Sequence, residues 1–151
     1  MTSDVIFPIP PGLFCVPSAL VALTGADIES VINPALNRAA RAETLTGAVG
    51  PAQLNHMLAA LNELGYDCRR ARDTHRHKVA TWAQTTLSRA YPRPLLLRVR
   101  GHVLVAFRGR VYDSIMPHGP RGVDHPYAGT VVTDAFLIQS RKKSPNAHDW
   151  N

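Results

Sequence analysis

The chain has 151 residues, of which 45% are hydrophobic and 19% are charged. This composition excludes a disordered linker and predicts one domain, because a chain of this length buries roughly 70% of the surface that its unfolded form exposes. The two cysteines cannot make a disulfide framework, so we expect a reducing compartment. No apolar run approaches the roughly 20 residues that span a bilayer, and the proline-rich start is unlike a secretory signal. We therefore expect a soluble protein that is not exported.

The positive charge is concentrated in arginine. The formal net charge is +6, with 17 Lys and Arg against 11 Asp and Glu. Basic clusters can neutralise phosphates, but a solvated face or an acidic protein partner accounts for them equally well. No recognised nucleic-acid module accompanies the charge and no aromatic residues are interleaved with it, so nucleic acid is the disfavoured partner. The clusters are Arg69, Arg70, Arg72, Arg76 and Lys78, and Arg141, Lys142 and Lys143.

Two helices are predicted near the N-terminus. The first begins near Cys15, with Pro17 in its first turn, where a missing N–H costs nothing, and with Gly25 as its terminator. Asp27 is a suitable N-cap for the second helix. Apolar residues at helical spacing continue that helix to residue 36, with Pro34 as a kink or an early end.

The rest of the chain combines two further helices with several strands. A polar connection over 41–50 leads to a strongly amphipathic helix over 51–64, and another helix is expected over 79–89. The segment 116–129 is rich in Gly, Pro and His, which is typical of a surface loop. The strand-like segments are 66–72, 95–99, 103–107 with 111–112, and 131–138.

The order of these elements predicts the fold class. Helices dominate the first part of the chain, strands dominate the last part, and regular βαβ alternation is absent. We therefore expect an α+β fold in which N-terminal helices pack on a C-terminal antiparallel sheet. One domain is expected over 1–140, followed by a polar tail over 141–151.

Cys15 is the first candidate for chemistry. At a helix N-terminus, the unpaired N–H groups and the positive end of the helix dipole favour a thiolate over a thiol, so Cys15 is a candidate nucleophile. The alternative is a buried structural thiol, because free cysteine is among the most buried residue types. Cys68 has no helix end to activate it and is interpreted as structural.

A predicted hairpin places His102 beside Asp113. With the turn centred on 108–109, these two side chains lie on one face of the hairpin, one diagonal step and roughly 7 to 8 Å apart. A carboxylate there would fix the tautomer and orientation of the imidazole. A bulge in the turn would change this parity. The expected pairs are Ala106 with Val111, Leu104 with Asp113, and His102 with Ile115.

Cys15, His102 and Asp113 together supply a nucleophile, a base and a group that orients the base. The segments GLFCVPSALVALTG and RVRGHVLVAFRGRVYDS resemble the papain-like cysteine peptidase fold. The likeness runs from about Gly12 to Ser114 and is greatest to the small double-glycine leader-peptidase type and to related papain-like domains of bacteria and phages. By this resemblance, Cys15 is the nucleophile, His102 the general base and Asp113 the orienting residue of a catalytic triad.

The resemblance implies a thiol hydrolase, a peptidase or an isopeptidase, acting on a peptide or protein. Such enzymes usually carry a Gln or Asn several residues before the cysteine, which donates to the oxyanion, but residues 7–12 contain neither. A missing donor of this kind costs roughly 100-fold to 1000-fold in turnover. The alternative is therefore a weak or inactive papain-like domain that serves as a binding or structural component of a larger assembly, such as a phage virion. The expected location is the cytoplasm of a bacterial host or a phage particle.

The remaining histidines are weaker candidates. His75 and His77 alternate in a basic segment and could share a metal ion, but two ligands without a nearby acid are more often a solvated loop. His118 and His125 either line the entrance to a cleft or face solvent. We therefore expect no metal, no other cofactor and no membrane partner.

Overall fold

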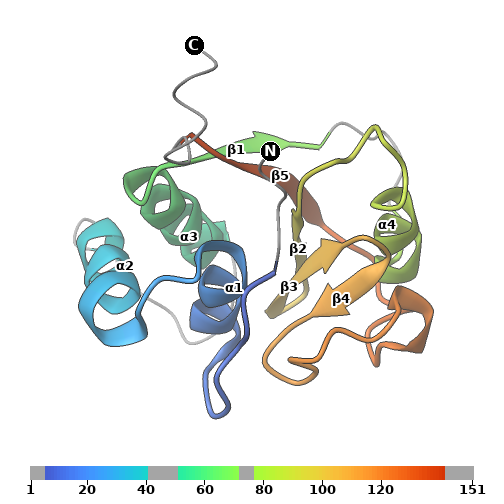
Figure 1. Cartoon of the computed structure of the whole chain (residues 1–151), viewed down its shortest axis with the longest axis horizontal. Coiled ribbons are helices and arrows are strands. Elements are labelled where there is room, and N and C mark those ends of the chain that lie inside the picture. The colour runs from blue at the N-terminus through green and yellow to red at the C-terminus, as the bar shows by residue number, and fades with distance from the viewer. Residues whose placement is uncertain (1–5, 41–50, 72–76, 142–151) are drawn as a thin grey trace.

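The structure is a computed structural model that describes residues 6–40, 51–71 and 77–141. Within these ranges it contains four α-helices and a five-stranded antiparallel sheet, so the predicted α+β class is confirmed (Figure 1). The predicted connection over 41–50 and most of the predicted tail lie outside the described residues. The helices are α1 (Cys15–Thr24), α2 (Asn33–Ala40), α3 (Pro51–Glu63) and α4 (Val79–Thr85). The strands are β1 (Tyr66–Arg70), β2 (Leu95–Val99), β3 (His102–Phe107), β4 (Arg110–Tyr112) and β5 (Asp134–Ser140).

The sheet separates two hydrophobic cores. Its strand order is β1-β5-β2-β3-β4. Because successive side chains of a strand point to opposite faces, Leu96 and Val103 pack with α1 and α3, whereas Leu97 and Leu104 pack with α4. Helices therefore cover both faces of the sheet, and β1 comes before α4 in the chain. The expected separation of helices first and strands last holds only in part.

α1 begins and ends where the sequence predicts. Gly25 adopts a left-handed conformation with a φ of 67°, and its N–H donates to the carbonyl oxygen of Val21 at 2.7 Å. The segment before α1 runs back along the helix, and the N–H of Phe7 donates to the carbonyl oxygen of Ala22 at 3.0 Å. Most of α1 is buried in the core that it shares with α3 and the sheet.

The second predicted helix is present, but its first turn is not α-helical. Asp27 is its N-cap, and its carboxylate accepts a hydrogen bond from the N–H of Ser30 at 2.9 Å. The first turn, Ile28–Ile32, is a π-helix, and α2 then starts at Asn33. Pro34 thus lies in the first turn of an α-helix, where it is tolerated, instead of ending the helix.

α4 is shorter than the predicted helix over 79–89, because a tertiary contact captures its C-terminal end. The hydroxyl of Thr86 donates to the carbonyl oxygen of Ala83 and accepts a hydrogen bond from the N–H of Gly109 at 2.8 Å. Gly109 belongs to the turn between β3 and β4. The end of α4 is therefore fixed by a turn that is distant in sequence.

The last strand is displaced from the predicted range of 131–138. The N–H of Thr133 donates to the carbonyl oxygen of Arg98 at 2.8 Å, and β5 starts at the next residue, Asp134. The carboxylate of Asp134 binds both Arg98 at 2.6 Å and Arg70 at 2.8 Å. At least part of the basic cluster around Arg70 therefore serves the internal structure of the sheet.

No helix in the described part of the chain is long and apolar enough to cross a membrane on its own. α1 and the helical segment 28–40 reach the required length only as a pair, and the pair is bent by 104°. Most of the α1 side chains are instead buried in the protein core.

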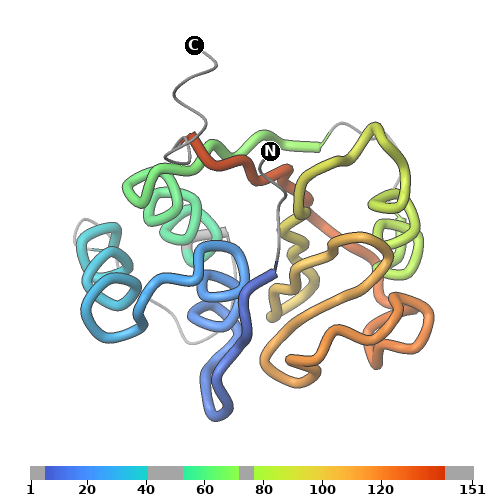
Figure 2. Tube along the Cα trace, in the orientation of Figure 1, coloured from blue at the N-terminus to red at the C-terminus, as the bar shows by residue number. Residues whose placement is uncertain are grey.

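The fold brings the start of the chain to its middle. α1 packs against β3, and the Cα trace shows the two segments side by side (Figure 2). β3 pairs with β2 on one side and with β4 on the other. The N-terminus of the first helix and the β3–β4 hairpin thus belong to one region of the molecule.

Candidate active site

Cys15 is the first residue of α1. The preceding residue, Phe14, is in an extended conformation and forms no side-chain cap, and the first turn contains no acidic residue. The N–H groups of the first turn are therefore available to an anion, as expected for a helix N-terminus. Cys15 is half-buried and packs at the edge of the core around α1. The predicted position of this thiol at a helix N-terminus is confirmed.

His102 is the first residue of β3. It directly follows the turn of residues 100–101 that reverses the chain after β2, and Val99 is its partner across the ladder. Its imidazole is almost fully buried, with a side-chain exposure of 9%. The Nε2 atom of the ring lies 2.7 Å from Oδ2 of Asp113. The predicted contact between this histidine and a carboxylate is therefore present.

Asp113 follows the end of β4 and is 1% exposed. The predicted register of the hairpin is confirmed by the pairing of Ala106 with Val111. The ladder ends at Tyr112, however, so the two further pairs that were expected are not formed as ladder pairs. The reason is a local turn, in which Oδ1 of Asp113 accepts a hydrogen bond from the N–H of Met116 at 2.6 Å.

Cys15 lies close to His102. Its thiol is near enough to raise the pKa of the imidazole, whose Nε2 is engaged by Asp113. Burial lowers the pKa of His102. The interactions with Asp113 and Cys15 raise it by a larger amount, so that the pKa is about 9. The geometry therefore favours an imidazolium at neutral pH, placed to stabilise a thiolate.

Asp113 is held in its ionised form. Burial alone would raise the pKa of its carboxyl group, but hydrogen bonds from His102 and the backbone of Met116, together with the close contact of His125, lower that pKa well below its usual range. A buried carboxylate that stays charged can stabilise the imidazolium of His102 without taking its proton. The three predicted site residues are thus brought together as a thiol, an imidazole and a carboxylate.

Two residues near this site were missed by the sequence reasoning. His125 was expected at a cleft entrance or in solvent, but it is 3% exposed, and its Nε2 lies 3.3 Å from Oδ1 of Asp113. The ring of Tyr127 lies against His102, with 4.9 Å between the ring centroids. Neither position follows from a local pattern, because both residues lie in a segment without regular hydrophobic periodicity. The sequence signal was only a histidine and a tyrosine two positions apart in a Gly- and Pro-rich loop.

The loop after Asp113 depends on a glycine, which gives a stability prediction. Gly119 has a φ of 70°, and a Cβ there would overlap the ring of Tyr112. We expect Gly119→Ala to lower the free energy of unfolding by roughly 2–4 kcal/mol, measured by urea unfolding. Gly129→Ala is the matched control, because its Cβ would meet nothing within 4 Å, and it should change stability little. Equal stability of the two variants would contradict the prediction.

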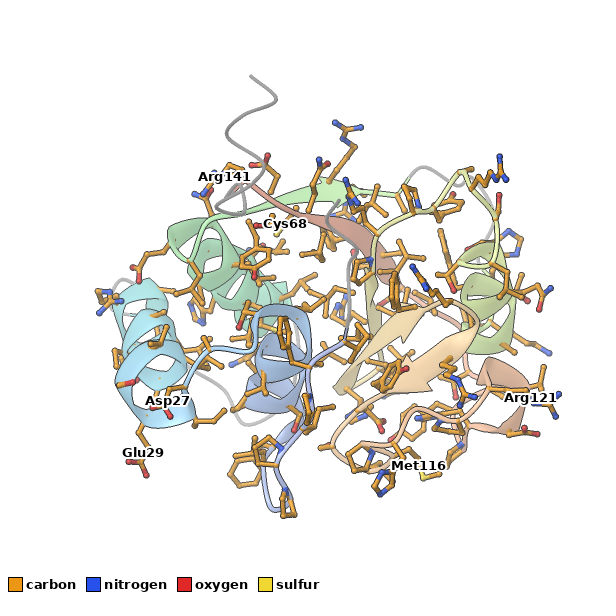
Figure 3. The ribbon with its side chains drawn as sticks, in the orientation of Figure 1. Asp27, Glu29, Cys68, Met116, Arg121 and Arg141 are labelled. Carbon is orange, nitrogen blue, oxygen red and sulfur yellow. The ribbon has the colours of Figure 1, made fainter. Side chains whose placement is uncertain are left out.

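The other cysteine is remote from this site. In Figure 3, Cys68 lies at the opposite side of the molecule from Met116, which holds the carboxylate of Asp113. Burial and the charge of Asp67 raise the pKa of the Cys68 thiol to about 11. Cys68 is therefore a poor nucleophile at neutral pH, in agreement with its interpretation as structural.

The described part of the chain does not support a metal site at the remaining histidines. His75 lies outside the described residues, and the ring of His77 packs edge-on against Trp82 with 6.0 Å between centroids. His118 is exposed. Within residues 6–40, 51–71 and 77–141, no group of three or more His, Cys, Asp or Glu side chains could hold a metal ion.

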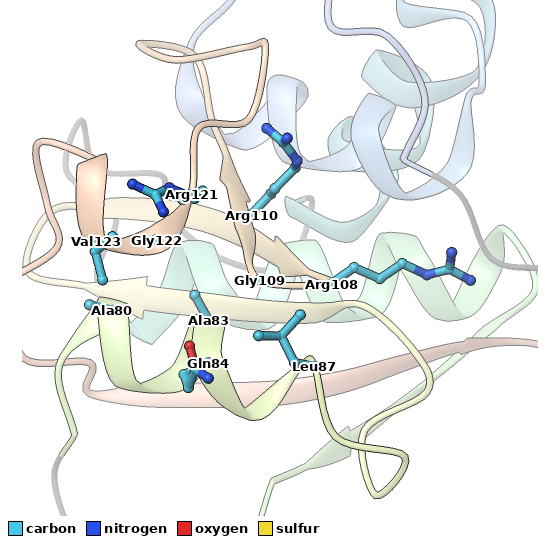
Figure 4. Close-up of a pocket in the computed structure, with 10 residues that line it drawn as sticks. All are labelled: Ala80, Ala83, Gln84, Leu87, Arg108, Gly109, Arg110, Arg121, Gly122 and Val123. Carbon is cyan, nitrogen blue, oxygen red and sulfur yellow. The ribbon is translucent and has the colours of Figure 1, made fainter.

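A separate pocket of about 470 Å³ lies between α4 and the turn that joins β3 and β4 (Figure 4). Arg108, Arg110 and Arg121 line it, but Figure 4 shows their guanidinium groups pointing away from one another. Arg110 donates to the carbonyl oxygen of Gly119, and Arg121 pairs with Asp124. The pocket therefore does not direct these charges at one ligand.

The chemistry of the site rests on its geometry. Residues from α1, the start of β3 and the end of β4 meet around one buried imidazole. Comparison of the chain with protein families, with curated proteins and with solved structures gave no match.

Proposed function

We propose that the protein is a papain-like cysteine hydrolase, a peptidase or isopeptidase that cleaves an amide bond of a peptide or protein. The observation that carries this proposal is the buried hydrogen bond of 2.7 Å between Nε2 of His102 and Asp113, on an imidazole that also contacts Cys15. A structural cysteine would need neither a charged partner nor a position at an uncapped helix N-terminus. The packing of the cysteine-bearing helix on an antiparallel sheet that carries the histidine supports a papain-like arrangement.

The reaction would proceed in two acyl-transfer steps. The thiolate of Cys15 attacks the carbonyl carbon and forms a C–S bond, while the carbonyl oxygen takes up the negative charge. The intermediate collapses as the C–N bond breaks, and the imidazolium of His102 gives its proton to the departing amine. His102 then removes a proton from a water molecule, which attacks the thioester. The C–S bond breaks, the acid is released, and the thiolate and imidazolium are restored.

Backbone groups would stabilise the oxyanion. The first turn of α1 presents the N–H groups of Cys15 and Val16 next to the thiol, without a side-chain cap or an acidic residue to occupy them. Pro17 contributes no N–H, so these two donors are the ones that the first turn offers. A hole made of backbone groups would replace the Gln or Asn side chain that residues 7–12 lack.

Exposed apolar side chains beside the site favour a peptide substrate. Phe14 directly precedes the nucleophile and is 85% exposed, and Ile115 is 53% exposed two residues after Asp113. Large exposed apolar groups next to reactive residues are suited to binding the side chains of an extended peptide. The substrate class of the proposal is therefore a peptide or protein with apolar residues near the scissile amide bond.

The proposal can be tested without knowledge of the natural substrate. The protein and its Cys15→Ala variant are each incubated with a library of proteome-derived peptides, and new termini are identified by mass spectrometry. We expect cleavages made by the wild type that the Cys15→Ala variant does not make. The Cys68→Ala variant is the matched control and should cleave the same peptides as the wild type. Cleavage that survives in Cys15→Ala, or no cleavage by any of the three, would contradict a hydrolase.

The second candidate function is a binding or structural component of a larger assembly, such as a phage particle. It is favoured by one observation, the lack of a Gln or Asn in residues 7–12. A domain of this kind would keep the buried contact between His102 and Asp113 as part of its core and would not turn over. Its expected result is a wild-type protein that leaves the whole peptide library intact.

A further inference from the structure

The carboxylate of Asp113 has a second imidazole on its other side. Oδ2 faces His102, whereas Oδ1 accepts from the N–H of Met116 and lies 3.3 Å from Nε2 of His125. The side chains of Asp113 and His125 both have 0% exposure. His125 Nε2 makes no hydrogen bond of regular geometry in the described structure, although its distance from Asp113 is short enough for a polar contact.

The tautomer of His125 follows from its other ring nitrogen. The N–H of Tyr127 donates to Nδ1 of His125 at 2.9 Å, so Nδ1 carries a lone pair. The ring proton must then be on Nε2, which faces Oδ1 of Asp113. The backbone of His125 is also fixed, because its carbonyl oxygen accepts from the N–H of Ala128 at 2.9 Å.

We propose that His125 is a positioning residue, which rests on the proposed function: its Nε2–H holds Oδ1 of Asp113 so that Oδ2 stays directed at Nε2 of His102. A carboxylate that is free to rotate can offer either oxygen to a neighbour. Two N–H groups on Oδ1, from Met116 and His125, remove that freedom and leave Oδ2 for the imidazole. The extended unit is then Cys15, His102, Asp113 and His125, in that order of contact.

Packing joins the two histidines as well. The ring of Tyr127 lies 4.9 Å from that of His102 and 5.9 Å from that of His125, measured between centroids. Among the described residues, Asp113 is a charged group in contact with His125, and the ring of Tyr127 packs edge-on against the ring of His125. The lowered pKa of Asp113 agrees with this arrangement, because the contact with His125 is one of the causes that lower it.

The test compares two variants of His125, one that loses the contact with Asp113 and one that can restore it. His125→Asn retains an oxygen that can accept from the N–H of Tyr127, but its amide is too short to reach Asp113. His125→Gln has an amide N–H long enough to reach Asp113, and it serves as the conservative rescue. His118→Asn is the matched control, because His118 lies exposed in the same loop.

The main readout is the titration of the His102 ring, followed by NMR of imidazole nitrogens, with thermal unfolding as a check of folding. We expect His125→Asn to lower the pH midpoint of His102 by about one unit, which is a tenfold change in proton affinity. His125→Gln should recover most of this shift, and His118→Asn should behave as the wild type. Asp113→Asn combined with His125→Asn should shift the midpoint no further than Asp113→Asn alone.

The outcomes separate the two proposals. A wild-type midpoint in a folded His125→Asn variant, or shifts that add in the double variant, would overturn the role of His125. If His125→Asn does not fold, His125→Phe, which keeps a ring but has no N–H, takes its place with the same expectations. The His102 midpoint could depend on His125 in a protein whose Cys15 is alkylated no faster than glutathione. That result would reject the proposed hydrolase activity and keep the proposal that His125 positions Asp113 against His102.

Discussion

Iodoacetamide is expected to alkylate Cys15 at least about 100-fold faster than Cys68 at pH 7, because alkylation requires the thiolate. Burial and the charge of Asp67 raise the pKa of Cys68 to about 11. At that value, roughly one molecule in ten thousand carries a Cys68 thiolate at pH 7. Cys15 is half-exposed at the start of α1 and contacts an imidazole whose pKa is raised to about 9. The rates are measured by mass spectrometry of tryptic peptides taken over time.

The controls distinguish an activated thiol from one that is merely accessible. Glutathione provides the rate of an ordinary thiol, and the comparison is sharpest at pH 6, where an ordinary thiol is almost fully protonated. His102→Ala should slow the alkylation of Cys15 about tenfold at pH 6 and leave that of Cys68 unchanged. His118→Ala, in an exposed position, should change neither rate. Slow and equal labelling of both cysteines in the wild type would count against the proposed nucleophile.

Asp113→Asn is expected to lower the turnover of the hydrolysis by about 100-fold or more. The substitution keeps the shape of the side chain and leaves an oxygen for the N–H of Met116, but it removes the charge 2.7 Å from His102 Nε2. The imidazolium of His102 loses its main partner, and its pKa should fall from about 9. The measurement is the cleavage rate of a peptide identified with the library.

The pH dependence of the same cleavage reaction shows in which direction the pKa of His102 changes. In the wild type, cleavage should decline as pH rises through about 9, because His102 then loses the proton that it gives to the leaving amine. In Asp113→Asn this alkaline decline should move to lower pH. Asp124→Asn is the matched control, because Asp124 is an exposed carboxylate that pairs with Arg121. A wild-type rate and an unchanged alkaline limb in Asp113→Asn would exclude Asp113 from the proposed role.

Much of the site was predictable because its parts are locally encoded. Cys15 lies at the start of a helix whose end is set by Gly25, and both features appear within one stretch of sequence. The turn between β3 and β4 sets the register that pairs Ala106 with Val111, and this register brings Asp113 close to His102. The meeting of Cys15 with His102 was an expectation from the resemblance to papain-like peptidases.

The sequence by itself determined the elements whose signals act over a few residues: the bounds of α1, the strand β2, and the turn between β3 and β4. Tertiary structure alone decided where α4 stops, since the hydroxyl of Thr86 accepts the N–H of Gly109 from a distant turn. It also placed helices on both faces of the sheet and buried His125 beside Asp113. The physical reason is that periodicity and turn residues bias the backbone locally. Burial and hydrogen bonding between distant segments depend instead on how the whole chain packs, and no local pattern records that.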